Sequence, residues 1–258
     1  MNLYDLTYGQ PQLLRHTLTA PVKGLRIGFL TDLHVTGYRE KALAERVIGP
    51  FSREDTDILL LGGDYGETRE GEEIFFKLAA SLRPRYGSFA ILGNNDKERF
   101  GSSFPLIRRM AEKAGIQVLI NEEACLRLPQ GKVAIGGLDE KKYGQPSARG
   151  FFRRAGEDTL RILLCHYPSS VDKAISQAAK MPHLVLCGHT HGGQISMFGI
   201  TCYTFGYDKR FGGGSHHFVS GFRTFPEGFS MLVSNGLGES LVPFRIGAPR
   251  QMHIIETV

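Results

Sequence analysis

The sequence predicts an α/β fold, and two observations lead to that prediction. Short apolar runs typical of buried strands recur along the chain, at residues 26–30, 57–61, 88–92, 116–120, 133–135, 160–165, 183–187 and 231–233. Helical patterns lie between the first several runs, at residues 41–48, 72–82 and 105–114. Gly49 and Pro50 are expected to end the first of these helices, and Gly115 the third.

The pattern changes in the second half of the chain. After Cys125 the spacing indicates a hairpin with its turn at residues 129–131, and a further strand–helix–strand section follows over residues 160–187. Residues 192–228 are rich in glycine and aromatic side chains without periodicity, which predicts a long functional loop. No long linker separates the halves, so we expect a single domain over residues 1–258.

The composition is that of an ordinary globular protein. Of the 258 residues, 41% are hydrophobic and 22% charged, and no apolar run approaches the roughly 18 residues that a membrane-spanning helix needs. The first twenty residues lack a continuous apolar core, so we expect no signal peptide and a cytoplasmic protein. Four cysteines without CxxC spacing indicate reduced thiols.

The net charge of +5 would suit an anionic partner. The basic residues are scattered in twos and threes and form no nucleic-acid-binding motif, so we expect most of them on solvated faces, with some helping to hold a phosphorylated ligand. The segment 149–154 mixes aromatic and basic residues. It fits an interfacial or nucleic-acid patch, but a helix start with two phenylalanines in the core explains it better.

The strongest functional signal is a set of metal-ligand residue types placed directly after predicted strands. The set is Asp32, His34, Asp64, Asn94, His166, His189 and His191. In an open α/β sheet the carboxyl ends of the strands form the ligand-binding edge, so these side chains are expected to converge. Carboxylate, amide oxygen and imidazole together suit Mn²⁺, Fe or Zn²⁺, and the set contains no thiolate that would favour zinc.

The spacing within the set has a physical interpretation. Residues two apart in an extended backbone project to the same side, so Asp32 with His34, and His189 with His191, are each expected to turn both side chains inward. A glycine stands immediately before Asp64, before Asn94 and before His189. Glycine permits the tight turns and close approaches that a crowded metal centre requires.

These motifs resemble the calcineurin-like metallophosphoesterases, whose pattern is DxH, GD, GNH(D/E), a lone His and GHxH. In the same order, this chain has residues 32–34, 63–64, 93–96, His166 and residues 188–191. The longer GHTHGGQ signature at 188–194, followed by residues 234–238, resembles the small bacterial branch of that family. The resemblance implies a four-layer αββα sandwich with two central sheets and a dinuclear metal site.

The resemblance also implies a role for each ligand. One metal would be held by Asp32, His34, Asp64 and His191, and the other by Asp64, Asn94, His166 and His189. Asp64 would bridge two divalent ions, with Mn²⁺ expected first and Fe or Zn²⁺ as alternatives. Ions about 3.5 to 4 Å apart would lower the pKa of a shared water, so that a metal-bound hydroxide attacks the phosphorus, and would stabilise the attacking and leaving oxygens.

One position departs from the family pattern. Where the family usually has a histidine after the metal-binding Asn, this chain has Asn95, whose amide can donate a hydrogen bond but cannot deliver a proton. General acid catalysis is typically worth about 10² to 10⁴ in rate. Either the leaving group needs no proton or another residue supplies it, and His216, His217 and Lys97 are the candidates.

The sequence therefore predicts a dinuclear metal hydrolase acting on a phosphodiester or pyrophosphate bond in a phosphorylated small-molecule or lipid-linked substrate. One specific candidate is UDP-2,3-diacylglucosamine in lipid A synthesis, because a superfamily branch with that activity also lacks the usual histidine. Peripheral contact with a membrane stays compatible with this reading. The alternative is a non-catalytic metal-binding scaffold with the same fold, as in the retromer subunit that resembles this family. The sequence indicates no oligomeric state.

Overall fold

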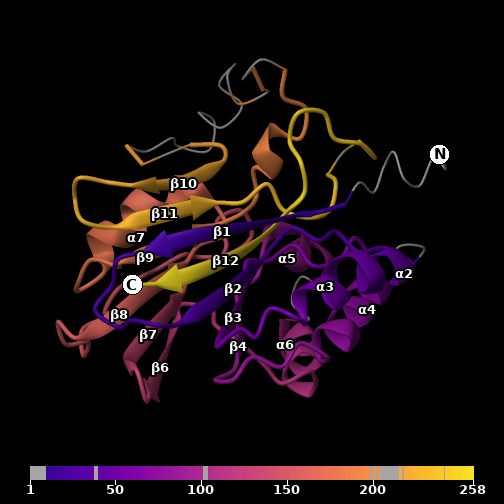
Figure 1. The fold of residues 1–258 in the computed structure, drawn as a ribbon. Coiled ribbons are helices and arrows are strands. Elements are labelled where there is room, and N and C mark those ends of the chain that lie inside the picture. Colours follow the sequence, from indigo (N-terminus) through magenta and orange to yellow (C-terminus); the bar gives the residue numbers. More distant parts are fainter. Residues whose placement is uncertain are drawn as a thin grey trace.

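Two six-stranded sheets form the centre of the protein in a computed structural model (Figure 1). The model describes residues 10–37, 40–100, 104–197, 200–201, 203, 215–216, 218–240 and 242–258. The first sheet has the order β1 (Gln12–Leu18), β12 (Gln251–Thr257), β2 (Arg26–Leu30), β3 (Ile58–Leu61), β4 (Ser88–Ala90) and β5 (Ile116–Val118). The second has the order β10 (Gly221–Thr224), β11 (Ser230–Val233), β9 (Leu184–Cys187), β8 (Thr159–Leu164), β7 (Gly131–Gly137) and β6 (Glu122–Leu128).

Both sheets are mixed, with a parallel centre. In the first sheet only the β12–β2 pair is antiparallel, and in the second only the pairs β10–β11 and β6–β7 at the edges. The β6–β7 pair is the hairpin that the sequence predicts around residues 129–131. The parallel core aligns the carboxyl ends of β2, β3 and β4 in one sheet and of β8 and β9 in the other.

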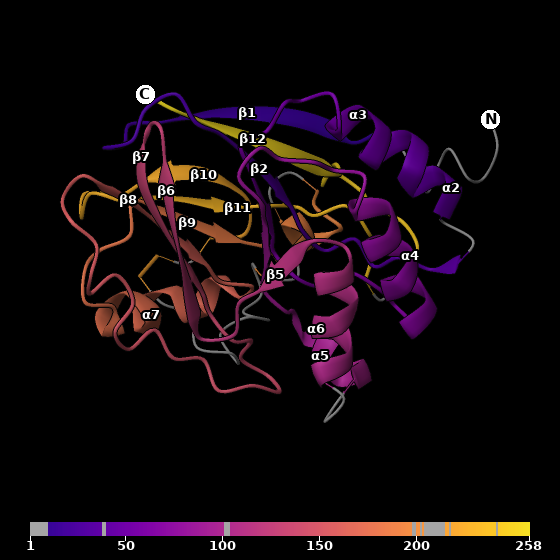
Figure 2. The ribbon, with the colours of Figure 1, turned by 90° about the horizontal axis from the view of Figure 1, so that it is seen from below.

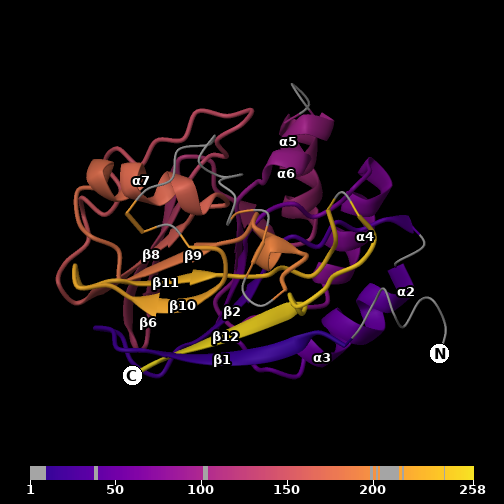
Figure 3. The ribbon, with the colours of Figure 1, turned by 90° about the horizontal axis from the view of Figure 1, so that it is seen from above.

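Helices cover the outer face of each sheet, which gives the four layers (Figures 2 and 3). On one side lie α2 (Glu40–Leu43), the π-helical turn η2 (Ala44–Ile48), α3 (Gly49–Phe51), α4 (Arg69–Ala79), α5 (Asn94–Phe100) and α6 (Phe104–Lys113). On the other side lies α7 (Val171–Gln177), after the short 3₁₀ turn η4 (Pro168–Ser170). The α/β fold class and its αββα layering are therefore confirmed. Among the described residues, no helix is both long and apolar enough to cross a membrane.

Alternation along β3 explains why the strand is apolar throughout. Leu59 and Leu61 pack in the cluster under the first helical layer, whereas Ile58 and Leu60 pack in the cluster between the two sheets. All four are fully buried, because successive side chains of a strand face opposite sides. A third cluster lies between the second sheet and α7. It includes Phe152, so the core reading of segment 149–154 is confirmed, although that segment forms turns rather than a helix.

Other sequence predictions about secondary structure are wrong or incomplete. Residues 192–228 are not loop throughout, because β10 lies among them and pairs with β11. Gly49 and Pro50 do not end the first helix, which continues through η2 and α3 to Phe51. Pro50 has no N–H to donate to the preceding turn, and it stands where the π-helical turn η2 passes into α3. Strands β1 and β12 were not predicted from the sequence. They pair in parallel across the chain, with Gln12 opposite Gln251, and no local pattern encodes a contact of that sequence separation.

His253, on β12, is expected to make the protein sensitive to acid. Its buried ring contacts Ser234 Oγ at 2.8 Å and the ring of His16 at 3.1 Å, and burial lowers the pKa of His253 to about 3. The unfolded chain has a histidine pKa near 6.5, so the fold holds this ring neutral. Its stabilising contribution is complete above pH 6.5 and falls by up to about 1.4 kcal/mol per pH unit as the pH drops toward 3.

The measurement is the free energy of unfolding by denaturant at a series of pH values. His253→Gln is expected to be less stable at pH 7 but to lose less stability between pH 6.5 and 4 than the wild type, because glutamine does not titrate. Equal pH slopes for the two proteins would contradict the assignment.

Candidate metal centre

The strand ends of both sheets bring the predicted ligands together in two clusters. The predicted ligands follow five strands. Asp32 and His34 come after β2, Asp64 after β3, Asn94 after β4, His166 after β8, and His189 and His191 after β9. The first cluster contains Asp32, His34 and His191, and its ligand atoms all lie within 4.8 Å of one another. The second contains Asp64, His166 and His189 within the same limit. Five of these six residues are buried, and His189 is half-buried.

Asp64 stands between the two clusters. Its Oδ2 atom lies 3.4 Å from His166 Nε2 in the second cluster and 3.7 Å from His34 Nε2 in the first. His34 Nε2 in turn lies 3.1 Å from His191 Nε2. Two imidazole nitrogens, one from each cluster, therefore lie within 3.7 Å of one carboxylate oxygen.

The backbone that presents these residues is left-handed, not extended. The φ angles are 51° at Asp32, 46° at His34, 55° at Asp64, 70° at His189 and 52° at His191. The extended backbone that the sequence analysis assumed is therefore wrong for both pairs, but all four side chains do turn inward, into the two clusters. His189 and His191 belong to different clusters. Left-handed backbone at a non-glycine residue costs roughly 1–2 kcal/mol, and such strain concentrates at functional sites.

The glycine before Asn94 is required by close packing, as the sequence predicts. A Cβ atom built on Gly93 would lie only 2.7 Å from the backbone nitrogen of Asp64 and would also contact its carboxylate. No side chain fits that space, because real Cβ contacts do not come so close. Gly93 thus lets the loop after β4 lie directly against Asp64.

His166 provides a test of whether these residues fit a metal ion. Its Nδ1 atom lies 2.8 Å from the carbonyl oxygen of Gly62 and donates to it, which leaves Nε2 as the atom that takes up a proton or a metal. That buried Nε2 has no hydrogen-bond partner among the residues described. Its charged neighbour is Asp64 Oδ2 at 3.4 Å, and a cation between the two atoms would bind both. The donor set of carboxylates and imidazoles therefore fits a divalent metal.

The electrostatics of the site also favour a cation. Burial lowers the pKa of His166, but the carboxylates of Asp64 and Asp32 outweigh burial and raise that pKa to about 10. Burial raises the pKa of Asp64, yet His166 and His34 hold it well below its usual range. The buried carboxylate thus stays ionised because positive charge is held next to it.

Asn94 and Asn95 begin α5 and both face the centre. Asn94 Oδ1 accepts a hydrogen bond from the Tyr167 hydroxyl at 3.0 Å. The Asn95 side-chain nitrogen lies 3.0 Å from His34 Nδ1 and donates to Glu67 Oε1 at 3.3 Å. The Asn95 amide therefore occupies the position at which the family pattern has a histidine, directly beside a candidate ligand.

Three residues that the sequence analysis did not single out support the ligands. Glu67 contacts His34 Nδ1, and Arg245 Nη2 lies 3.0 Å from His191 Nδ1. The ring of Tyr167 lies 3.8 Å from the ring of His189, centroid to centroid. Tyr167 directly follows a predicted ligand, which was an available signal. Nothing in the local sequence distinguishes Glu67 or Arg245 from surface charges.

The two candidate proton donors that the structure describes, His216 and Lys97, are each paired with carboxylates outside the two ligand clusters. The ring of His216 contacts the carboxylate of Asp172 on α7 and lies 3.4 Å from Glu227, so two acids hold it. Lys97 pairs with Asp139 at 2.6 Å in a nearly buried ion pair. His217 lies outside the described residues. A catalytic role for Asn95, His216 or His217 therefore stays a prediction.

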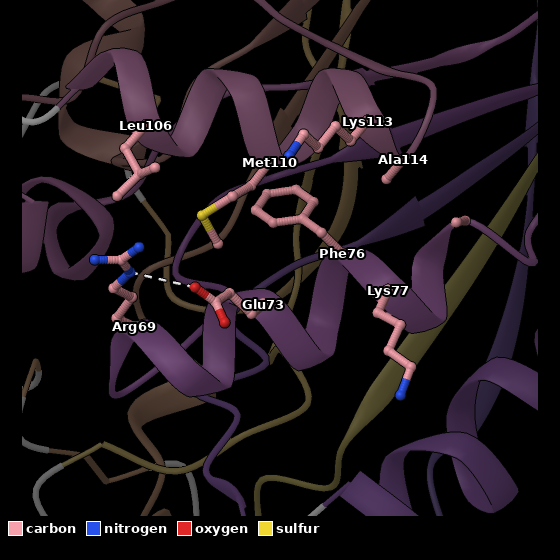
Figure 4. Close-up of a pocket in the computed structure, with 9 residues that line it drawn as sticks. Arg69, Glu73, Phe76, Lys77, Leu106, Met110, Lys113 and Ala114 are labelled. Atoms are coloured by element: carbon pink, nitrogen blue, oxygen red, sulfur yellow. Dashed lines mark hydrogen bonds and ion pairs between the residues drawn. The ribbon is translucent and has the colours of Figure 1, made fainter.

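A groove of about 440 Å³ lies in the outer helical layer between α4 and α6 (Figure 4). Phe76 of α4 and Leu106 and Met110 of α6 give it an apolar floor, and Arg69 pairs with Glu73 at 3.2 Å on one rim. None of the residues in the two ligand clusters lines this groove. Its chemistry does not indicate a catalytic role.

Two sheets with a buried centre of carboxylates and histidines at their strand ends fit a metal-dependent phosphoesterase. The family model described as calcineurin-like phosphoesterase matches residues 25–193, and the chain belongs to this family. It is thus an enzyme of the metallophosphoesterase class, a family that uses divalent metals. The resemblance inferred from the sequence motifs is confirmed at the level of the family.

Similar sequences and a similar solved structure agree with this family assignment. The chain is 31% identical over 193 residues to the phosphodiesterase YaeI of Escherichia coli, covering 71% of this chain and 68% of YaeI. It is 27% identical to the uncharacterized metallophosphoesterase YkuE of Bacillus subtilis, and the match covers 90% of this chain and 78% of YkuE. The structure of TT1561 from Thermus thermophilus aligns with a TM-score of 0.51 at 12% identity, covering 83% of this chain and 91% of that one. That likeness concerns the fold alone.

Proposed function

We propose that this chain hydrolyses phosphodiester or pyrophosphate bonds with two divalent metal ions. The observation that carries the proposal is the position of Asp64 Oδ2, within 3.7 Å of an imidazole nitrogen from each cluster. Asp32, His34 and His191 would hold one ion, and Asn94, His166 and His189 the other, with Asp64 shared. Mn²⁺ is the first candidate metal, with Fe or Zn²⁺ as alternatives, because the donors are oxygen and nitrogen without thiolate.

Paired ions of this kind supply Lewis acidity and a water of lowered pKa. The chain's own residues fix the geometry. Glu67 and the Gly62 carbonyl set the orientations of His34 and His166, and the Tyr167 hydroxyl orients the Asn94 amide. Asn95 can donate a hydrogen bond to a phosphoryl oxygen but cannot deliver a proton.

The substrate class follows from the missing donor. A phosphate leaving group with a pKa of roughly 6 to 7 departs largely unassisted at neutral pH, whereas an alkoxide does not. A nucleotide-sugar pyrophosphate such as UDP-2,3-diacylglucosamine meets this condition and is the specific candidate for a lipid-linked substrate. The name of the relative YaeI supports phosphodiesters as the wider class.

The direct experiment measures bound metal per chain and then hydrolysis of bis(p-nitrophenyl) phosphate with added Mn²⁺. Two metals per chain with turnover that a chelator removes would support the proposal. Tight metal binding without turnover on nucleotide-sugar pyrophosphates, cyclic nucleotides or simple diesters would instead favour a non-catalytic scaffold.

His189→Ala and His191→Ala are each expected to remove mainly one metal, and not the same one. The two residues are close in sequence but lie in different clusters. Anomalous scattering from crystals of the two variants, grown with the same metal, would show which position is vacated. If both variants vacate the same position, the assignment of ligands to two ions is wrong.

Asn95→His is expected to raise kcat on alkyl phosphodiesters by roughly tenfold or more and to leave pyrophosphates little changed. The new imidazole would replace an amide that already lies beside His34 and Glu67. The measurement is log rate against leaving-group pKa, which should slope steeply downward for the wild type and flatten in the variant. A shallow wild-type slope would mean that another acid already supplies the proton.

A further inference from the structure

Five exposed apolar side chains gather beside the metal centre, and we call this patch the apolar rim. The rim consists of Ile195, Met197, Ile200, Phe244 and Ile246, with exposed fractions from 38% to 56%. They are five of the seven large hydrophobic side chains exposed in the described part of the chain. Single exposed apolar residues are ordinary, but a contiguous group of them marks an interaction surface.

Backbone hydrogen bonds hold the two rim segments together. The Ser196 N–H donates to the Ile246 carbonyl at 2.7 Å, and the Ile246 N–H donates to the Gln194 carbonyl at 2.9 Å. Met197 and Ile200 form an antiparallel bridge at the tip of the first segment. The rim is therefore a built surface, formed by chain segments far apart in sequence.

Two polar side chains of these segments, those of Gln194 and Arg245, are hydrogen-bonded to the fold, whereas the five apolar side chains of the rim are exposed. Gln194 is buried and donates to the carbonyl of Val242 at 2.8 Å. Arg245, between two rim residues, donates to the carbonyls of Gly238 at 2.9 Å and His191 at 3.1 Å. This arrangement inverts the usual pattern of a surface loop. It also fixes the rim directly to a candidate metal ligand.

We propose that the apolar rim docks on the surface of a lipid bilayer and so presents a lipid-linked phosphate to the metal centre. This rests on the proposed function, whose substrate class it narrows. Residues 194–201 and 242–249 contain no Asp or Glu, and Arg245 is their single charged residue, so anionic headgroups meet no repulsion from them. The net charge of +5 acts in the same direction.

The size of the rim favours a bilayer over a second copy of the chain. Five half-exposed side chains present on the order of 400 Å². A stable dimer buries about 800 Å² on each partner, roughly twice as much. A bilayer needs less area, because each CH₂ group that enters the hydrocarbon raises the partition coefficient about fourfold.

The experiment is co-sedimentation with vesicles of phosphatidylcholine and phosphatidylglycerol in equal parts. The double variant Met197→Ser/Ile200→Ser is expected to lower the partition coefficient at least roughly tenfold. The matched control Tyr143→Ser/Val258→Ser removes two side chains exposed by 46% and 47% outside the rim, and should bind within about twofold of the wild type. Both double variants should keep wild-type turnover on the soluble bis(p-nitrophenyl) phosphate.

Three results would separate the two proposals. Wild-type protein that hydrolyses the soluble diester but ignores vesicles would overturn the rim proposal alone. Protein that binds vesicles through the rim but hydrolyses no diester would support the rim as a lipid surface and refute the proposed function. Sedimentation velocity that shows a wild-type dimer converted to monomer by the rim variant would overturn the bilayer in favour of a second copy.

Discussion

Asp64→Ala should abolish hydrolysis and release both metal ions. The carboxylate lies between the two ligand clusters, with Oδ2 3.4 Å from His166 Nε2 and 3.7 Å from His34 Nε2. In the proposed assignment, each of the two ions would lose a ligand and the pair would lose the carboxylate that they share. Lewis-acid stabilisation by metal ions is worth several kcal/mol, so the rate should fall by roughly a thousandfold or more. Metal content by mass spectrometry and turnover on a soluble diester are the two measurements.

Two controls separate a lost ligand from a damaged loop. Asp64 Oδ1 also accepts the Asn95 N–H at 2.8 Å, so the alanine variant removes a loop contact as well. Asp64→Asn can keep that contact while losing the charge, and it should still lose most of its metal. Asp32→Ala should leave the second cluster intact and retain more metal than Asp64→Ala. A stoichiometric pair of metals with near-normal turnover in Asp64→Ala would show that the site is wrongly assigned.

Much of this site could be predicted because strand ends in a parallel sheet are encoded locally. The all-apolar run of β3 predicts a strand that is buried on both faces. Asp64, the polar residue that follows this strand, is therefore expected at the edge of the sheet. The same logic places His166 after β8 and His189 after β9. These predictions need only the order of strands, which short-range patterns provide.

The geometry within the site could not be predicted in the same way. Sequence spacing suggests an extended chain at Asp32 and His34, but tertiary hydrogen bonds hold both in the left-handed region. The Asp32 N–H donates to the Gly63 carbonyl at 2.9 Å, and the His34 N–H to the Asp64 carbonyl at 3.1 Å. Such contacts join separate loops, so their effect on φ is invisible in either loop alone.

The supporting residues show the same limit. Glu67 and Arg245 act on ligands 33 and 54 residues away in the chain, and neither belongs to a motif. Asn95 could be singled out only by comparison with a family pattern. Its contacts with the carboxylate of Glu67 and the ring of His34 could be identified only from the folded structure.

Asp96 is the residue whose loss should most damage the scaffold of the site. It is fully buried, and its carboxylate accepts three backbone N–H groups from two loops, those of Gly93 at 2.7 Å, Asp64 at 2.8 Å and Tyr65 at 2.9 Å. Asp96→Ala would leave these donors buried and unpaired. At about 1–3 kcal/mol for each orphaned group, the free energy of unfolding should fall by about 3 kcal/mol or more. Denaturant unfolding measures the loss.

Asp96→Asn distinguishes this acceptor role from a general need for negative charge. An amide can turn its single oxygen toward the donors of Gly93 and Asp64, which share Oδ2 in the wild type, and then loses only the bond from Tyr65. Its stability should therefore lie between the wild type and Asp96→Ala. Asp158→Ala removes an exposed aspartate that lies 3.3 Å from Lys132 and should change stability by no more than about 0.5 kcal/mol. If Asp96→Ala proves as mild as Asp158→Ala, then the three hydrogen bonds do not hold the two loops together, and the position of Asp64 depends on the metal ions instead.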